Sequence, residues 1–297
     1  MAHISNYLAP EVISKIENLH LRARLMVEGF IVGLHKSPYH GFSVEFSEHR
    51  AYGHGDEIKR IDWKLFGKTN RYYIKQFEEE TNLRAYLLLD QSKSMEFSSG
   101  SITKLQYGKT ISAVLSYLML RQQDAVGMAA FDTKIRNFIP ARSKSRHLSV
   151  LLSAFDQLQS GEETSIAPIL HQIAEKINKR GLIVLVSDLF DEPEKVLSGL
   201  KHFRHRGHEV VVFHVLDRRE YDLDFKQRTR FIDMESGKKL TTDPWHIREY
   251  YTREIKEFCN FFRRHCRKNR MDYIRVFTDE PLDKVLSNYL MKRSRMS

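Results

Sequence analysis

The chain contains little that would suit a secreted or membrane-spanning protein. Its 297 residues include only two cysteines, too few for a disulfide scaffold, and we expect both Cys259 and Cys266 to be buried thiols on one helix. The clearest apolar runs, such as LIVLV at 182–186, are far shorter than the roughly 18 residues of a membrane span. The first twenty residues show no basic segment followed by an apolar one, so no signal peptide is expected. We therefore expect a cytoplasmic protein without a transmembrane segment, and leave open only peripheral contact with a membrane.

The chain also lacks the glycine-rich loops that bind nucleotide phosphates. Neither GxxxxGK[ST] nor GxGxxG after a strand occurs, which argues against nucleotide binding. Internal repeats and low-complexity tracts are absent as well. What the chain does have is core material, because 41% of its residues are hydrophobic and 11% are aromatic. Wholesale disorder is therefore excluded.

Positive charge is concentrated in the last third of the chain. The net charge is +10, and residues 201–297 carry 23 basic and 15 acidic side chains, a net +8. Such a region suits an anionic partner, such as nucleic acid, an acidic protein or a membrane surface. A solvated helix face explains the same charge. We favour the solvated face, because the basic cluster at 261–270 falls at an expected helix C-terminus, where cations complement the helix dipole.

Two regions with different patterns meet near residue 83. Residues 1–83 are predicted to form an N-terminal extension with a helix over 10–30 and strands over Phe42–Tyr52 and Arg71–Glu80. A short helix containing Trp63 is expected between the two strands. From residue 84 to residue 297, strands and helices alternate, and this part is predicted to form the main domain.

The main domain is predicted to be α/β. Apolar strands separated by helices indicate a doubly wound, mostly parallel sheet of the Rossmann type, covered on both faces. A charged insertion at about 221–241 is expected to add two short strands. The expected strands are 85–90, 125–131, 134–140, 181–188, 208–217 and 272–279. The expected helices are 104–121, 144–159, 166–179, 193–205, 244–268 with Asp243 as its N-cap, and 281–293.

Oxygen-bearing side chains follow two of these strands at their carboxyl ends, where ligands bind in such sheets. Asp90, Ser92 and Ser94 alternate along one loop, so a carboxylate and two hydroxyls can converge on one point. Asp188 ends a second strand, and Thr164 lies in the loop before a helix. Hard oxygen donors of this kind suit Mg²⁺ or Mn²⁺. The sequence therefore predicts a metal site with these five ligands.

Simpler interpretations compete with this prediction. The loop at 90–94 could merely cap the helix that follows it. Thr164 has Ser165 beside it and could itself cap the next helix. Asp191 competes with Asp188, which we favour because it ends its strand directly.

The same pattern carries a family resemblance. Asp-x-Ser-x-Ser after the first buried strand, with a loop threonine and an aspartate ending a later strand, resembles the metal-ion-dependent adhesion site (MIDAS) of von Willebrand factor A domains. The resemblance covers about residues 84–293. It implies a von Willebrand A-like fold in which Mg²⁺ is held by Asp90, Ser92, Ser94, Thr164 and Asp188. The open position of the metal would then accept an Asp or Glu carboxylate from a protein partner.

Residues 45–81 carry a second resemblance, to the block that precedes this domain in the bacterial "domain of unknown function fifty-eight" family. Larger members carry N-terminal membrane helices, which are not seen here. The resemblance implies a gene that accompanies a MoxR-type AAA+ ATPase and a role as adaptor in the assembly or maturation of client proteins. The matching residues are Glu45-Phe46, Arg50, Tyr52, Gly55-Asp56, Arg60, Ile61-Asp62-Trp63, Lys75 and Glu78 to Glu80. Of these, Arg50, Arg60, Asp62 and Trp63 either dock the extension onto the main domain, which we favour, or contact a partner.

We therefore expect a non-enzymatic, metal-dependent protein-binding adaptor, with two alternatives. A nucleic-acid-binding module would use the basic last third, but RRM, KH and zinc-finger signatures are absent. A metal-dependent hydrolase would need a nucleophile or a cation beside the metal, and the only nearby candidate, Lys93, is expected to point away. His202, His205 and His208 run from a helix end into a strand, so they are not expected to share a zinc ion.

Overall fold

A computed structural model describes residues 18–19, 21–27, 49–51, 63–75, 83–161, 166–225, 227–232 and 239–294. Contacts divide the chain into two compact units, residues 1–37 with 83–297 and residues 38–82. Of the helices in the described ranges, not one combines the length and the apolar character needed to cross a bilayer.

Six strands form the central sheet of the larger unit. They are β3 (Arg84–Asp90), β4 (Ala125–Phe131), β5 (Ile135–Arg142), β6 (Leu182–Ser187), β7 (Glu209–Leu216) and β10 (Asp272–Phe277). The strand order is β10-β7-β6-β3-β4-β5, and every neighbouring pair is parallel except the antiparallel hairpin β4–β5. The inner strands are apolar along their length because both faces of the sheet are covered.

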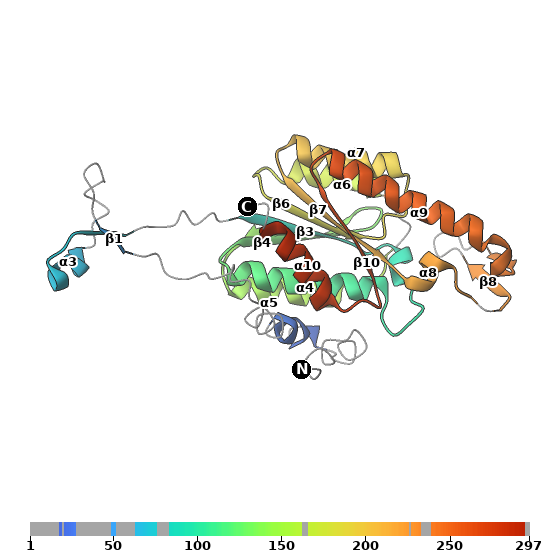
Figure 1. The fold of residues 1–297 in the computed structure, drawn as a ribbon, viewed down its shortest axis with the longest axis horizontal. Helices are drawn as coiled ribbons and strands as arrows, with labels where there is room; N and C mark the ends of the chain where they lie inside the picture. The colour runs from blue at the N-terminus through green and yellow to red at the C-terminus, as the bar shows by residue number, and fades with distance from the viewer. Residues whose placement is uncertain are drawn as a thin grey trace. The chain divides into compact units, whose positions relative to one another are not determined.

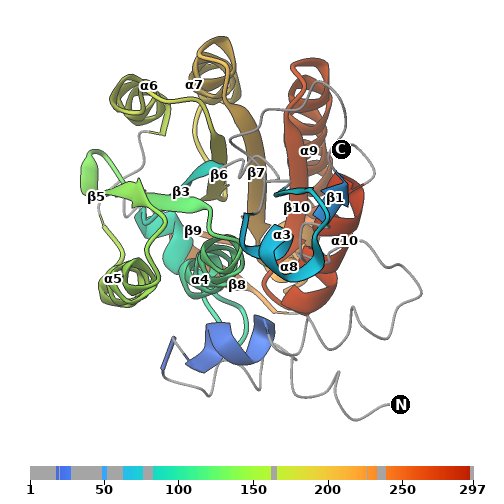
Figure 2. The ribbon, with the colours of Figure 1, turned by 90° about the vertical axis from the view of Figure 1, so that its left-hand side faces the viewer.

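Helices cover both faces of this sheet (Figure 1 and Figure 2). One face carries α4 (Lys104–Arg121), α5 (Arg146–Gln157) and α10 (Leu282–Ser294), which share one hydrophobic core. The other carries α6 (Ile166–Lys176), α7 (Pro193–His205) and α9 (Pro244–Lys268), which share a second core. The predicted α/β class, with a doubly wound and mostly parallel sheet, is confirmed.

The order of the strands fixes where a ligand can bind. From β3 the chain crosses to β4 on one side, whereas β6 pairs with β3 on the other side. The carboxyl ends of β3 and β6 therefore flank a topological switch point, the usual ligand site of an open α/β sheet. Asp90 is the last residue of β3 and Ser187 is the last residue of β6.

The described helical residues 21–27 pack with the larger unit. Ala23, Met26 and Val27 are buried in the core that α4 also lines. The Arg22 guanidinium donates to the Thr110 hydroxyl of α4 at 3.3 Å. This helix therefore lies with the main domain, although it falls in the segment 1–83 that we assigned to the extension.

The smaller unit, residues 38–82, contains a two-stranded antiparallel sheet and a helix in its described part. The strands are β1 (His49–Ala51) and β2 (Tyr73–Lys75), and the helix is α3 (Trp63–Thr69). The Phe66 and Tyr72 rings stack with centroids 4.5 Å apart, and Trp63 packs edge-on against both. Most of this unit's matching family residues, including Arg60 and Asp62, lie outside the described residues.

The insertion between β7 and α9 has the expected two strands. It contains a short helix, α8 (Arg218–Asp222), and the antiparallel pair β8 (Thr229–Ile232) and β9 (Lys239–Thr242). Helix α9 begins at Pro244 as predicted, although the Asp243 side chain makes no capping hydrogen bond. Both cysteines of α9 are buried free thiols, as expected.

Candidate metal site

Asp90 anchors the candidate site from the end of β3. Its side chain is completely buried. One carboxylate oxygen accepts the backbone N–H of Ser92 at 2.9 Å, and the other accepts the Ser187 hydroxyl at 2.6 Å. The first bond closes the loop over Asp90, and the second joins the ends of β3 and β6. The strand pairing thus fixes the orientation of this carboxylate.

Ser92 and Ser94 present their hydroxyls side by side. Their oxygens lie 3.1 Å apart, at the start of the short 3₁₀ helix η3 (Lys93–Glu96). Lys93, between them in the sequence, is exposed. The structure thus brings the three residues of the predicted loop together.

Thr164 falls outside the described residues, as do its neighbours 162–165. The chain that leads to it is held beside the loop at 90–94, because the Gly161 N–H donates to the Gln91 carbonyl at 2.6 Å. A Cβ atom at Gly161 would lie 2.0 Å from a carboxylate oxygen of the buried Asp132. Only glycine therefore fits this close approach. The role of Thr164 stays a prediction.

Asp188 follows β6 directly and is completely buried. One of its carboxylate oxygens accepts the Phe190 N–H at 3.3 Å. The turn after it is strained, because Leu189 has a φ of 58°, in the left-handed region that bulky residues rarely adopt. Asp191 makes a different contact, because its carboxylate accepts a hydrogen bond of 2.9 Å from the N–H of Ile166 at the start of α6.

A residue that the sequence did not reveal completes the site. The Lys104 ammonium, at the start of α4, lies 2.8 Å from a carboxylate oxygen of Asp188 and 2.8 Å from one of Glu220 in α8. Lys104 is 0% exposed and its ammonium lies 4.9 Å from the centre of the Phe190 ring. The expectation that Lys93 is the only nearby lysine is therefore wrong. A lysine one residue after a capping threonine resembles any exposed helix lysine, so the sequence offers no signal for this ion pair.

The buried acids affect each other's protonation. Burial, together with the nearby charge of Asp188, raises the pKa of Asp90 to about 7 despite the hydrogen bonds it accepts. Burial also lowers the pKa of His214, on β7, to about 3, so this imidazole is neutral at pH 7. Burial raises the pKa of Glu220, and the Lys104 charge opposes this shift. A cation near Asp90 would relieve the unfavourable burial of its charge.

The donor set fits Mg²⁺ or Mn²⁺. Two carboxylates and two hydroxyls are the hard oxygen ligands that these ions take. The spacing of 3.1 Å between the Ser92 and Ser94 hydroxyls is close to the distance of about 3 Å between adjacent ligands of an octahedral Mg²⁺. Asp188 can still serve, because a carboxylate has about four lone-pair positions. Within the described ranges, no group of three or more His, Cys, Asp and Glu side chains could hold a metal, so a metal here depends on the hydroxyls.

A pocket of about 560 Å³ opens beside this loop. Its lining is mostly polar and includes Gln91, Asn137, Gln157 and Ser160. Gln91 is nearly buried, and its side-chain carbonyl oxygen has no hydrogen-bond partner in the described part of the chain. A mostly polar pocket therefore lies next to the candidate metal ligands.

The three histidines of the sequence HFRHRGH make different contacts. The Nδ1 atom of His202 lies 3.0 Å from the Nδ1 atom of His171 in α6. His208 is buried edge-on against Phe203, whereas His205 is exposed. They do not converge, in agreement with the prediction.

The sequence of the chain matches one protein family and several proteins of known sequence. The model of the family described as "Protein of unknown function DUF58" matches residues 48–258. The chain is similar to "Uncharacterized protein Rv1480" of Mycobacterium tuberculosis (strain ATCC 25618 / H37Rv) and to "Uncharacterized protein Mb1516" of Mycobacterium bovis (strain ATCC BAA-935 / AF2122/97). Each is 25% identical over 240 residues, which are 79% of this chain and 75% of the relative.

The chain is also similar to several solved structures. BatB from Bacteroides thetaiotaomicron, a conserved hypothetical protein, is 17% identical with a TM-score of 0.47 over 72% of this chain and 100% of its own. An aerotolerance-related membrane protein from Bacteroides fragilis is 18% identical, with a TM-score of 0.48 over 71% and 99%. The VWA domain of SpRpn10 is 10% identical, with a TM-score of 0.41 over 69% and 94%.

Proposed function

Because the chain belongs to the DUF58 family, whose description states no function, we propose a function from the site itself: metal-dependent binding of a protein partner. The observation that carries the proposal is the loop at 90–94 beside Asp188 at the switch point of the sheet. Asp90 is fixed by hydrogen bonds from Ser92 and Ser187, and the two loop hydroxyls lie 3.1 Å apart. In this proposal Asp90, Ser92, Ser94, Thr164 and Asp188 hold one Mg²⁺ or Mn²⁺.

The bound metal would supply an electrophilic position for an anionic ligand. Serine and threonine hydroxyls are neutral ligands, so three of the five proposed ligands add no negative charge and the ion stays electrophilic. A carboxylate of Asp or Glu from a partner would then complete the coordination. The von Willebrand A-like pattern of the five residues supports this mode of binding.

The partner we propose is a MoxR-type AAA+ ATPase or a client protein on which it acts. The resemblance of residues 45–81 to the family block supports this choice, and the adaptor would serve assembly or maturation of the client. The partner's carboxylate would meet the metal at the end of β3, next to the polar pocket that Gln91 lines.

The site is proposed to be non-catalytic. Lys104 is the one cation seen on the candidate ligands in the described part of the chain, and both of its partners are acids, so it is not free to hold a transferring phosphate. We expect the purified chain to release no phosphate from ATP or from p-nitrophenyl phosphate with Mg²⁺. Turnover that disappears in Asp188→Ala would instead favour a hydrolase.

The proposal is tested by partner affinity in a grid of NaCl, EDTA and variants. A carboxylate bonded to the metal should survive moderate salt but not chelation, whereas screened surface charges weaken as the Debye length falls from about 10 Å at 0.1 M to about 3 Å at 1 M salt. We expect binding to be lost with EDTA and in Ser92→Ala/Ser94→Ala. Neutralising the exposed Arg263, Arg264, Arg267 and Lys268 should change it little.

The opposite pattern would overturn the proposal. Binding that ignores EDTA, fades steeply with salt and needs the basic residues of α9 would identify the basic surface as the interface. Capture of random oligonucleotides under the same conditions would then favour the nucleic-acid alternative.

A further inference from the structure

Lys104 is a completely buried lysine beside two acids, and its burial needs an explanation. A lysine ammonium is costly to remove from water, and it is tolerated inside a protein only when it is paired. Lys104 is paired twice, with Asp188 and with Glu220, each at 2.8 Å. Since Asp188 is a candidate metal ligand, the lysine is a fixed cation attached to the metal site.

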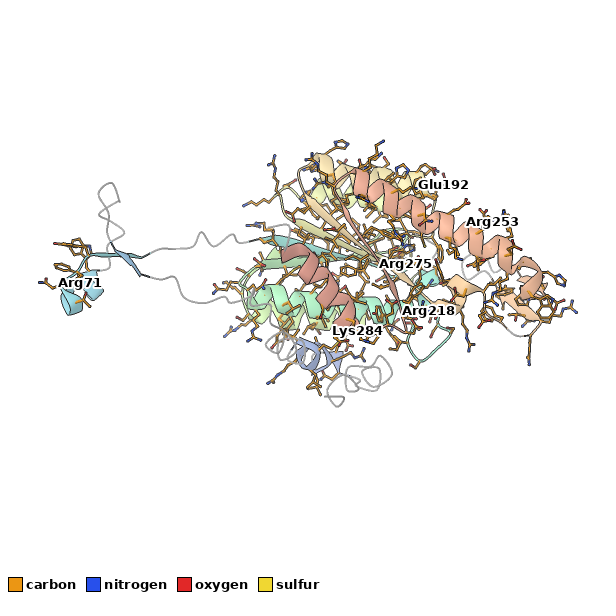
Figure 3. All side chains as sticks on the ribbon, viewed as in Figure 1. Arg71, Glu192, Arg218, Arg253, Arg275 and Lys284 are labelled. Atoms are coloured by element: carbon orange, nitrogen blue, oxygen red, sulfur yellow. The ribbon has the colours of Figure 1, made fainter. Side chains whose placement is uncertain are left out.

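Other cations near α8 are engaged elsewhere. Arg218 forms ion pairs with Asp279 and Glu280, and Arg275 of β10 donates to the Tyr221 hydroxyl at 2.8 Å. Figure 3 labels both arginines. The local charge is therefore set by Asp90, Asp188, Glu220 and Lys104.

We infer that Lys104 sets the net charge of the metal site so that the loaded site is neutral and does not repel a carboxylate. With the three acids ionised and Lys104 protonated, these four residues carry a net charge of −2. A divalent ion changes this to zero, and a partner carboxylate brings it to −1. Without Lys104 the loaded site would carry −1 and would repel the same carboxylate.

This inference rests on the proposed function and makes a prediction that the function alone does not. Lys104 should weaken metal binding, because it repels the ion, and it should strengthen carboxylate binding. Removing its charge must therefore move the two affinities in opposite directions. A purely structural lysine would move both in the same direction or move neither.

Three variants form a charge series. With metal bound, the local charge is +1 in Glu220→Gln, 0 in the wild type and −1 in Lys104→Met. It is also 0 in Lys104→Met/Glu220→Gln, which is therefore the charge-matched control for the wild type. Metal affinity is measured by Mn²⁺ titration with electron paramagnetic resonance. Carboxylate binding is measured by the broadening that bound Mn²⁺ causes in the acetate methyl resonance, with acetamide as the neutral control.

We expect Mn²⁺ affinity to rise from Glu220→Gln through the wild type to Lys104→Met, by about tenfold or more per charge, and the double variant should match the wild type. Acetate affinity should follow the reverse order, and acetamide should show no trend. If Lys104→Met does not fold, Glu220→Gln still gives one step of the series and the double variant still gives its charge-matched control. Unchanged Mn²⁺ affinity across the series, or parallel changes in both ligands, would overturn the inference. Mn²⁺ binding by the wild type that does not need Asp90 is a different result, and it would overturn the proposed function.

Discussion

Asp217 shows how single residues hold the neighbourhood of the site. It precedes α8, the helix that carries Glu220, and one of its oxygens accepts the N–H groups of Arg219 at 2.9 Å and Glu220 at 3.4 Å. It also accepts the Ser99 hydroxyl at 2.6 Å and the Ser99 N–H at 2.9 Å. The carboxylate thus caps α8 and joins it to the chain that follows η3.

These bonds predict a pH-dependent contribution to stability. Burial alone would raise the pKa of Asp217, but the hydrogen bonds from Ser99, Arg219 and Glu220 hold it below its ordinary value. A lowered pKa means that the stabilisation is present above the unfolded pKa of about 3.9 and is lost as the pH falls further. Asp217→Ala should lower the free energy of unfolding by about 1–2 kcal/mol at pH 7.

Asp217→Asn is the matched control, because it keeps an oxygen acceptor and removes the charge. In urea unfolding, the difference between the wild type and Asp217→Asn should narrow as the pH falls below about 4. A difference that stays constant from pH 7 to acid pH would show that the charge of Asp217 contributes nothing.

Residue types could be predicted at this site, but their partners could not. Asp90, Ser92 and Ser94 repeat every second position after a buried strand, so their convergence follows from local geometry. Lys104 and Glu220 are 116 positions apart in the chain. Their meeting at Asp188 depends on how α4 and α8 pack at the end of the sheet, and no local pattern records that packing.

At the scale of elements, apolar strands were the easiest to predict. The strands β6 and β7 are nearly continuous runs of valine, leucine and isoleucine, because the sheet is covered on both faces. The helix around residues 21–27 was expected as a helix, whereas its place beside α4 follows from tertiary contacts. An amphipathic helix shows which face is buried but not what covers it.

The packing of that helix gives a prediction. Ala23 is 0% exposed, so Ala23→Glu would bury a charge without a partner and should cost about 2 kcal/mol or more of unfolding free energy. Leu25, on the same helix, is 42% exposed. Leu25→Glu should therefore change stability by no more than about 0.5 kcal/mol. Equal losses in the two variants, measured by urea unfolding, would mean that the helix does not pack on the main domain.

At the scale of the whole molecule, the distribution of charge and the topology of the sheet indicate two different candidate interfaces. The last third carries most of the net charge of +10, and its basic cluster at the end of α9 is exposed. The sheet places its polar residues elsewhere, at the ends of β3 and β6. The amino-acid composition is enough to locate the basic region in the sequence. Only the strand order of the sheet shows that the carboxyl ends of β3 and β6 lie next to each other. We propose that the partner binds at the second of these places, the ends of β3 and β6.

The most direct test is the titration of the purified chain with Mn²⁺. We predict one bound ion per chain in the wild type, at least about tenfold weaker binding in Asp90→Ala, and wild-type affinity in Asp191→Ala, whose acid accepts the Ile166 N–H of α6. Far-UV circular dichroism should show the same fold in all three. Equal Mn²⁺ binding by the wild type and Asp90→Ala would contradict the metal site and the function proposed from it.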